Sequence, residues 1–223
     1  MFIQRQCIAT GCKALTAGYS TFCRKHKTAK ARHGDPLQAS VSATRLAPYL
    51  RRIQARYSAN SGSAAWSMLA KRWAVIVEDA LSTLEAYQQG AASVRHHVQA
   101  AEQVRTIATA VDPLKVVHVA LAVYLIADVE PRAFRSDRGF DWQLVRRVRS
   151  LAPVNIGTTW NSKTGLMTRA YRDVPPRVTA VLAGQLKEAF GSAGLQLAGL
   201  ERHRIDPKEA ERQRLAEAIE ALQ

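Results

Sequence analysis

A cluster of cysteines near the N-terminus sets the strongest limit on how this 223-residue chain can fold. Its three cysteines are Cys7, Cys12 and Cys23, and His26 follows them with the spacing C-x4-C-x10-C-x2-H. Three thiolates and one imidazole are a donor set that tetrahedral Zn²⁺ takes, supplied here as two close pairs. A segment this short has no other core, so we expect residues 1–36 to fold around a bound metal. The sequence therefore predicts a small N-terminal zinc module.

Two alternatives concern the ligands of this module. The cysteines could be free thiols that pack as small apolar residues, and His33 is a candidate fourth ligand in place of His26. Gly18 supplies a turn, after which Tyr19 and Phe22 are expected to form a small apolar cap. An odd number of clustered cysteines does not suit a secreted disulfide scaffold, which favours a reducing, cytoplasmic location.

The predicted module closes on a basic run followed by a short characteristic ending: His33, Gly34, Asp35 and Pro36. Together with the two ligand pairs, this ending resembles the small zinc modules of phage and mobile-element proteins, some fused to HNH nucleases and others to DNA-binding domains. The chain departs from that pattern at Lys27, where an aromatic residue is usual, and at Ala29 and Ala31, where basic residues are common. The resemblance covers about the first sixth of the chain. It implies a nucleic-acid context without fixing an activity.

Positive charge is concentrated in two blocks of the chain. The formal net charge is +14, and residues 1–56 contain eleven Lys and Arg against the single acid Asp35. Residues 131–177 contain ten against three acids, whereas the remaining segments are slightly acidic. Two basic surfaces are typical of a protein that binds a polyanion, and we expect double-stranded DNA. The expected contacts are Arg24, Lys25, Lys27, Lys30, Arg32, Arg51, Arg52, Arg146, Arg149, Lys163, Arg169 and Arg172.

Outside the module, the chain is predicted to be mainly helical. Aromatic residues make up only 7% of it, while Ala, Leu and Val are prominent, which favours helices over a sandwich or barrel. A short basic helix and linker are expected over 37–61 and a helical domain over 62–223. The first helices of that domain are expected over 63–89, over 91–110 and from Asp112 to the residue before Pro131.

The C-terminal part of the chain is expected to contain two more helices. The first begins at Pro175 and Pro176 and weakens at the Gly-rich stretch FGSAGLQLAG, and the second begins at Asp206. The second helix carries an apolar stripe of Leu215, Ile219 and Leu222, which docks on the body or pairs with a second copy of the chain.

Residues 131–177 are expected to form a winged-helix-like region. A helix over 140–151 would place Trp142, Arg146 and Arg149 opposite its apolar arc. A β-hairpin around NSKTG would follow, carrying the last three basic residues of the expected contacts. In this arrangement the helix enters a major groove and the hairpin lies on the DNA backbone. The alternative is that the tryptophans are core residues and the arginines are solvated.

The function predicted from these features is that of a zinc-containing, non-catalytic DNA-binding protein of phage or mobile-element type. One alternative is a nuclease or recombinase that the zinc module targets to DNA. The sequence lacks an HNH series, clustered carboxylates and a P-loop, and its one conceivable nucleophile is Tyr171. The other alternative is an adaptor whose zinc module builds a surface for a protein partner. No apolar run reaches the roughly 20 residues of a membrane span, so no membrane partner is expected.

Overall fold

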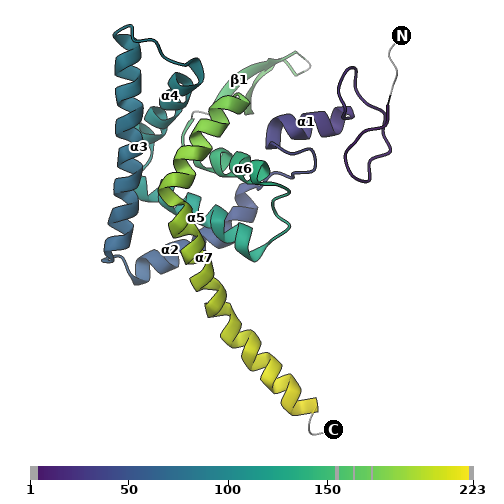
Figure 1. The fold of residues 1–223 in the computed structure, drawn as a ribbon, viewed down its shortest axis with the longest axis vertical. Helices are drawn as coiled ribbons and strands as arrows, with labels where there is room; N and C mark the ends of the chain where they lie inside the picture. The colour runs from purple at the N-terminus through teal and green to yellow at the C-terminus, as the bar shows by residue number, and fades with distance from the viewer. Residues whose placement is uncertain (1–4, 154–155, 163, 172, 221–223) are drawn as a thin grey trace.

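The computed structural model describes residues 5–153, 156–162, 164–171 and 173–220. It is mainly helical with one small hairpin, which confirms the predicted fold class. The helices, shown in Figure 1, are α1 (Arg24–His33), α2 (Ala43–Ala59), α3 (Ala64–Gln88), α4 (Arg95–Ala110), α5 (Pro113–Val129), α6 (Asp137–Arg149) and α7 (Pro176–Glu220). The strands β1 (Ile156–Asn161) and β2 (Leu166–Tyr171) are antiparallel, with Thr159 opposite Thr168.

Helix α5 is the centre of the helical body. All its residues from Val116 to Ile126 are buried, and it packs against α2, α3, α6 and α7. A helix that is apolar on every side is stable because other helices cover all its faces. Asp112 caps it by accepting a hydrogen bond from the Leu114 N–H over 2.8 Å, and Pro113 occupies its first turn, as predicted.

No single helix among the described residues is long and apolar enough to cross a membrane. Helices α4 and α5 reach that length and apolarity only as a pair. The chain bends by 116° between them.

Helix α7 is one continuous helix, so the expected weakening in the Gly-rich stretch and the separate helix from Asp206 were wrong. A Cβ atom at Gly194 would lie 2.5 Å from Cγ of Tyr124 in α5, and one at Gly191 would lie 3.4 Å from the hydroxyl oxygen of Tyr124. A contact of 3.4 Å is ordinary, whereas one of 2.5 Å is not possible, so Gly194 allows α7 to approach α5 closely. In Figure 1 the C-terminal part of α7 extends away from the other helices. The side chains of its predicted apolar stripe lie outside the described residues.

The buried hydrophobic residues that the structure describes form two separate clusters. The small cluster is built on Cys7, Ala9 and Cys23, whereas the large one draws on all helices from α2 to α7. Leu46 and Ile53 of α2 belong to the large cluster, so α2 packs into the same core as the helices that follow it. The domain boundary at Gly62 stays a prediction from composition.

Candidate metal centre and basic surface

The side chains of Cys7, Cys12, Cys23 and His26 converge at the start of α1. Their ligand atoms all lie within 4.8 Å of one another. The Sγ atoms of Cys7 and Cys23 each lie 3.4 Å from Nδ1 of His26, and the Sγ atoms of Cys12 and Cys23 are 3.9 Å apart. Bonds of about 2.3 Å to sulfur and about 2.0 Å to nitrogen give a tetrahedral zinc site edges of about 3.5–3.8 Å. The four side chains therefore lie close enough to hold a metal ion.

The local chain path explains this convergence. The Cys7 N–H donates to the Ala14 carbonyl and the Cys12 N–H to the Ala9 carbonyl, both over 2.9 Å, so the chain folds back between the first two cysteines. Cys23 is the residue before α1 and His26 lies in its first turn. The three-residue spacing places both side chains on one side of that turn.

Two thiols of the cluster have shifted pKa values. Burial raises the pKa of Cys7, but hydrogen bonds with the backbone of Cys23 and Ala9 and with the His26 ring outweigh it and lower the pKa to about 6. For Cys12, a hydrogen bond with the Ala14 backbone lowers the pKa, but burial and the thiols of Cys7 and Cys23 outweigh that effect and raise it. Because the thiolate is the metal-binding form, the lowered pKa favours Cys7 as a ligand for a divalent ion near neutral pH.

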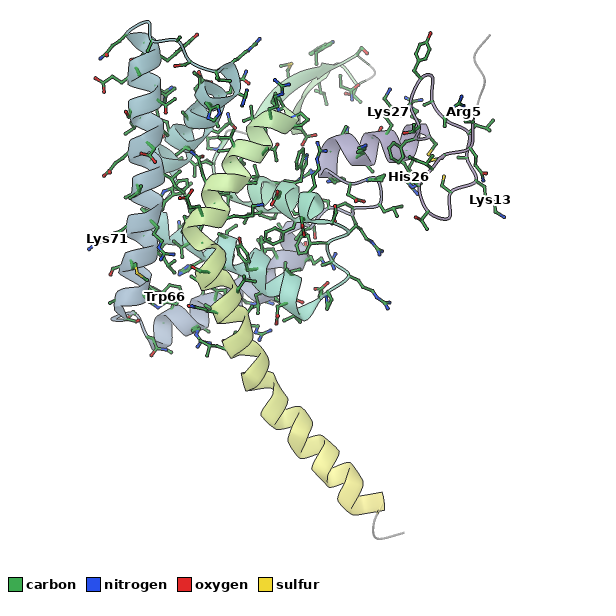
Figure 2. All side chains as sticks on the ribbon, viewed as in Figure 1. Arg5, Lys13, His26, Lys27, Trp66 and Lys71 are labelled. Carbon is green, nitrogen blue, oxygen red and sulfur yellow. The ribbon has the colours of Figure 1, made fainter. Side chains whose placement is uncertain are left out.

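Helix α1 is the most basic element of the structure and has no buried residue. Its five cations are all exposed, and the helix contains no acidic residue: Arg24, Lys25, Lys27, Lys30 and Arg32. Lys30 and Arg32 in the last turn suit the helix dipole, whereas Arg24 and Lys25 in the first turn oppose it, and like charges three residues apart repel each other. Helix stability therefore does not explain the cations of the first turn. Figure 2 shows Lys27, Arg5 and Lys13 in the N-terminal module.

The ending of the module attaches α1 to α6. Gly34 has a φ of 81°, and a Cβ atom there would lie 2.8 Å from the carbonyl oxygen of Arg138 and 3.0 Å from the Trp142 ring. Asp35 accepts a hydrogen bond from the hydroxyl of Ser136, the residue that caps α6. The ending at residues 33–36 therefore serves as a joint between α1 and α6.

Two buried amide side chains extend this joint. Gln38 donates to the Ala133 carbonyl and accepts from the Arg135 N–H, in each case over 2.9 Å. Gln143 of α6 accepts from the Val41 N–H over 2.8 Å. We define the joint as residues 33–41 together with these partners on α6 and the loop before it.

The joint also covers the face of α6 that was expected to be exposed. Trp142 is buried, and Arg149 is only 3% exposed and donates from Nε to Gln103 Oε1 over 2.8 Å. The expected DNA contact at Arg149 is therefore corrected to a buried hydrogen bond between α6 and α4. Arg146 is half-buried, with Nη1 3.3 Å from Nδ1 of His33. A recognition helix needs a free face, and α6 has no exposed residue from Gly139 to Arg149 to provide one for the predicted winged helix.

Two residues were predicted as alternative fourth ligands. His33 contacts Gln143 and Arg146 of α6, whereas His26 lies with the three cysteines in the candidate metal site. Burial lowers the pKa of His33, and the guanidinium of Arg146 lowers it further, against an opposing effect of Asp173. His33 is therefore part of the joint.

The remaining expected contacts divide into three groups. Arg52 of α2 forms a 3.0 Å ion pair with the buried Glu201 of α7, so it joins two helices, whereas Arg51 is exposed. Lys163 and Arg172 lie outside the described residues. Of Arg169 only the backbone in β2 is described, as is that of the conceivable nucleophile Tyr171, and their side chains lie outside the described part of the chain.

The DNA contacts expected from the sequence did not include three exposed arginines near the start of α6. Arg132, Arg135 and Arg138 are exposed in the loop before α6 and in its first turn. The concentration of positive charge over residues 131–177 could have indicated them. The guanidinium of Arg138 lies over the Trp142 ring, 4.8 Å from its centroid.

Tyr19 and Phe22 were expected to form an apolar cap, which was wrong for Tyr19. Phe22 packs against the small cluster, and Lys30 Nζ lies 4.8 Å from the centroid of its ring. Tyr19 is 93% exposed.

No protein-family model, curated protein or solved structure matches the chain. Function is therefore inferred from the residues and geometry of this chain alone.

Proposed function

We propose that this chain is a zinc-containing, non-catalytic protein that binds double-stranded DNA through the surface of its metal module. The observation that carries the proposal is helix α1, which holds five exposed cations and no acid. Its N-terminal end is anchored at the metal cluster and its C-terminal end at the joint. We define the basic surface as these five residues with the exposed Arg5 and Lys13.

Zinc is the proposed metal because of the donor set. Three thiolates and an imidazole suit Zn²⁺, whereas Mg²⁺ and Ca²⁺ take oxygen ligands. With four protein ligands the coordination is complete, which leaves no position for a water or a substrate. We therefore assign the metal a structural role, which is to fold the segment that carries α1.

The basic surface would act on the phosphate backbone. Lys and Arg that neutralise phosphates release counterions, so binding through them weakens steeply as salt rises. The side chains on this exposed helix are long enough to reach the phosphates of a bound duplex. The arrangement agrees with the nucleic-acid context implied by the resemblance to phage and mobile-element modules.

The test is a titration of the zinc-loaded protein with a labelled DNA duplex at several salt concentrations. The variant combines Lys25→Gln, Lys27→Gln and Arg32→Gln. The matched control combines Lys71→Gln, Arg95→Gln and Arg105→Gln, which removes the same charge from exposed positions of α3 and α4. Lys71 lies on the opposite side of the molecule from the module in Figure 2.

We expect the α1 variant to weaken binding at least about tenfold and to reduce the slope of log affinity against log salt by about one for each lost contact. The control should keep most of the affinity of the unmodified protein. Equal losses in both variants would show that only net charge matters and would contradict the assignment to α1. Negligible binding at low salt would overturn the proposal and leave the adaptor function.

A further inference from the structure

Tyr19 projects from the tip of the metal module. It follows Gly18, whose φ is 57°, in a turn closed by the Ser20 N–H donating to the Ala17 carbonyl over 3.1 Å. The Ala17 N–H donates to the Phe22 carbonyl over 3.0 Å and closes the loop. Phe22 then fills the small apolar cluster from this loop, and Tyr19 is left 93% exposed.

The exposed ring is not alone on the module. Ile8 is 66% exposed, and its N–H donates to the carbonyl of Thr21, so it lies beside the loop that carries Tyr19. Leu15 is 57% exposed. Apolar surface that stays in water adds little to the stability of so small a fold. Exposed apolar side chains on a positively charged module are typical of a binding surface.

The cations of the module indicate the kind of partner. Lys13, Arg24 and Lys25 are exposed on the same module, and the module has no acidic residue before Asp35. A positively charged surface with a projecting aromatic ring is the combination that binds single-stranded nucleic acid, because the cations hold phosphates and the ring stacks on a base. In a continuous duplex the faces of the bases are covered by their neighbours and cannot receive such a ring.

We infer that Tyr19 stacks on an unpaired base, so that the protein binds best where a single strand adjoins a duplex, as at an overhang or a gap. The inference rests on the proposed function: α1 supplies the phosphate contacts of the duplex, and Tyr19 adds a contact that needs an exposed base. Ile8 lies beside the same loop and would contact the adjoining sugar or base.

The test compares three labelled DNAs that share the same duplex. The first is blunt, the second has a five-nucleotide single-strand overhang, and the third has an abasic overhang of the same length. The abasic overhang keeps the phosphates and lacks the bases. The full-length zinc-loaded protein is compared with Tyr19→Ala, with Tyr19→Phe, and with Tyr87→Ala, a control tyrosine that is 54% exposed on α3. Zinc content and circular dichroism of each variant establish that the module is folded.

The unmodified protein should bind the overhang more tightly than the abasic overhang. Tyr19→Ala should bind the base-containing overhang about fivefold or more weakly while keeping its affinity for the abasic one. Tyr19→Phe keeps the stacking face, so it should behave like the unmodified protein, as should Tyr87→Ala.

Equal affinity of the unmodified protein for base-containing and abasic overhangs would overturn the inference. If the substitution at Tyr19 instead weakens binding equally to all three DNAs, the ring contacts the backbone and the inference fails. In both cases binding to the blunt duplex leaves the proposed function standing. Absence of binding to all three DNAs would overturn both and favour a protein partner on this apolar surface.

Discussion

The carboxylate of Asp35 accepts a hydrogen bond from the hydroxyl of Ser136 over 3.0 Å. The same hydroxyl accepts a hydrogen bond from the Gly139 N–H over 3.1 Å and so caps α6. One side chain therefore both starts a helix of the body and holds the module. The orientation of α1 depends on this shared group.

Replacing Ser136 by Ala should affect both elements. Loss of the cap and of the hydrogen bond to Asp35 should lower the free energy of unfolding by about 1–2 kcal/mol, measured by urea denaturation. Amide hydrogen exchange over residues 33–41 should also become faster. The control is Ser63→Ala, which removes the cap of α3 but touches no residue of the joint. If exchange over 33–41 is unchanged, Ser136 does not hold the module.

Removal of the metal should unfold the module and leave the helical body folded. The small cluster around Cys7 and Cys23 is separate from the large core, so the body does not depend on it. After chelation we expect a loss of helical signal matching the ten residues of α1 and an unchanged urea midpoint of the body. Cys23→Ser should reproduce this result without chelator. A module that stays protected from proteolysis without metal would show that its fold needs no ion.

Replacing Glu201 by Gln should loosen α7 from α2. The buried carboxylate pairs with Arg52 and Arg56, whose side chains remain 31% and 25% exposed. Because water partly solvates these guanidinium groups, we expect a loss of about 1–3 kcal/mol, below that of a fully buried pair. Arg52→Gln should cost less, since Glu201 keeps Arg56. The exposed Glu78→Gln on α3 is the control, and a loss as large in this control would contradict the role of the pair.

His118 should make stability depend on pH. Its ring lies between Tyr57 and Trp66, with centroid distances of 5.1 and 5.6 Å, and its Nε2 has no hydrogen-bond partner among the described residues. Burial lowers its pKa below the usual 6.5, against an opposing effect of Asp112. The unfolded chain therefore binds a proton more readily than the folded one. This contribution to stability is complete above about pH 6.5 and decreases as the pH falls.

The matching experiment measures urea denaturation between about pH 5 and 7.5. His118→Phe should reduce the pH dependence of the free energy of unfolding by up to about 1.4 kcal/mol per pH unit. The exposed His97→Gln on α4 is the control for removal of a histidine. An identical slope in His118→Phe and the unmodified protein would show that His118 does not titrate differently on folding.

The ligand cluster and the helices could be predicted from local signals. Cysteine and histidine spacing placed the four candidate ligands, and caps such as Asp112 with Pro113 marked helix starts. These signals act over one or two turns of chain, which a sequence displays directly.

The sequence could not predict which side chains of α6 are buried or that α7 is continuous, because both depend on segments distant in the chain. Arg149 is buried because Gln103, 46 residues away, accepts its hydrogen bond. Gly194 looked like a helix breaker because its partner, Tyr124, lies in another helix. Arg52 looked like a free cation because Glu201 is 149 residues away in the chain. An arginine shows its charge in the sequence but not its counterion.

If α1 binds DNA as proposed, its length limits how many base pairs this helix can cover. Ten residues of α-helix span about 15 Å. At 3.4 Å per base pair, this length corresponds to a footprint of about four base pairs, less than half a turn of the duplex. A footprint this short holds too little information to mark a unique address in a genome. Selection of such an address would have to come from a neighbouring contact or from a second chain placed alongside.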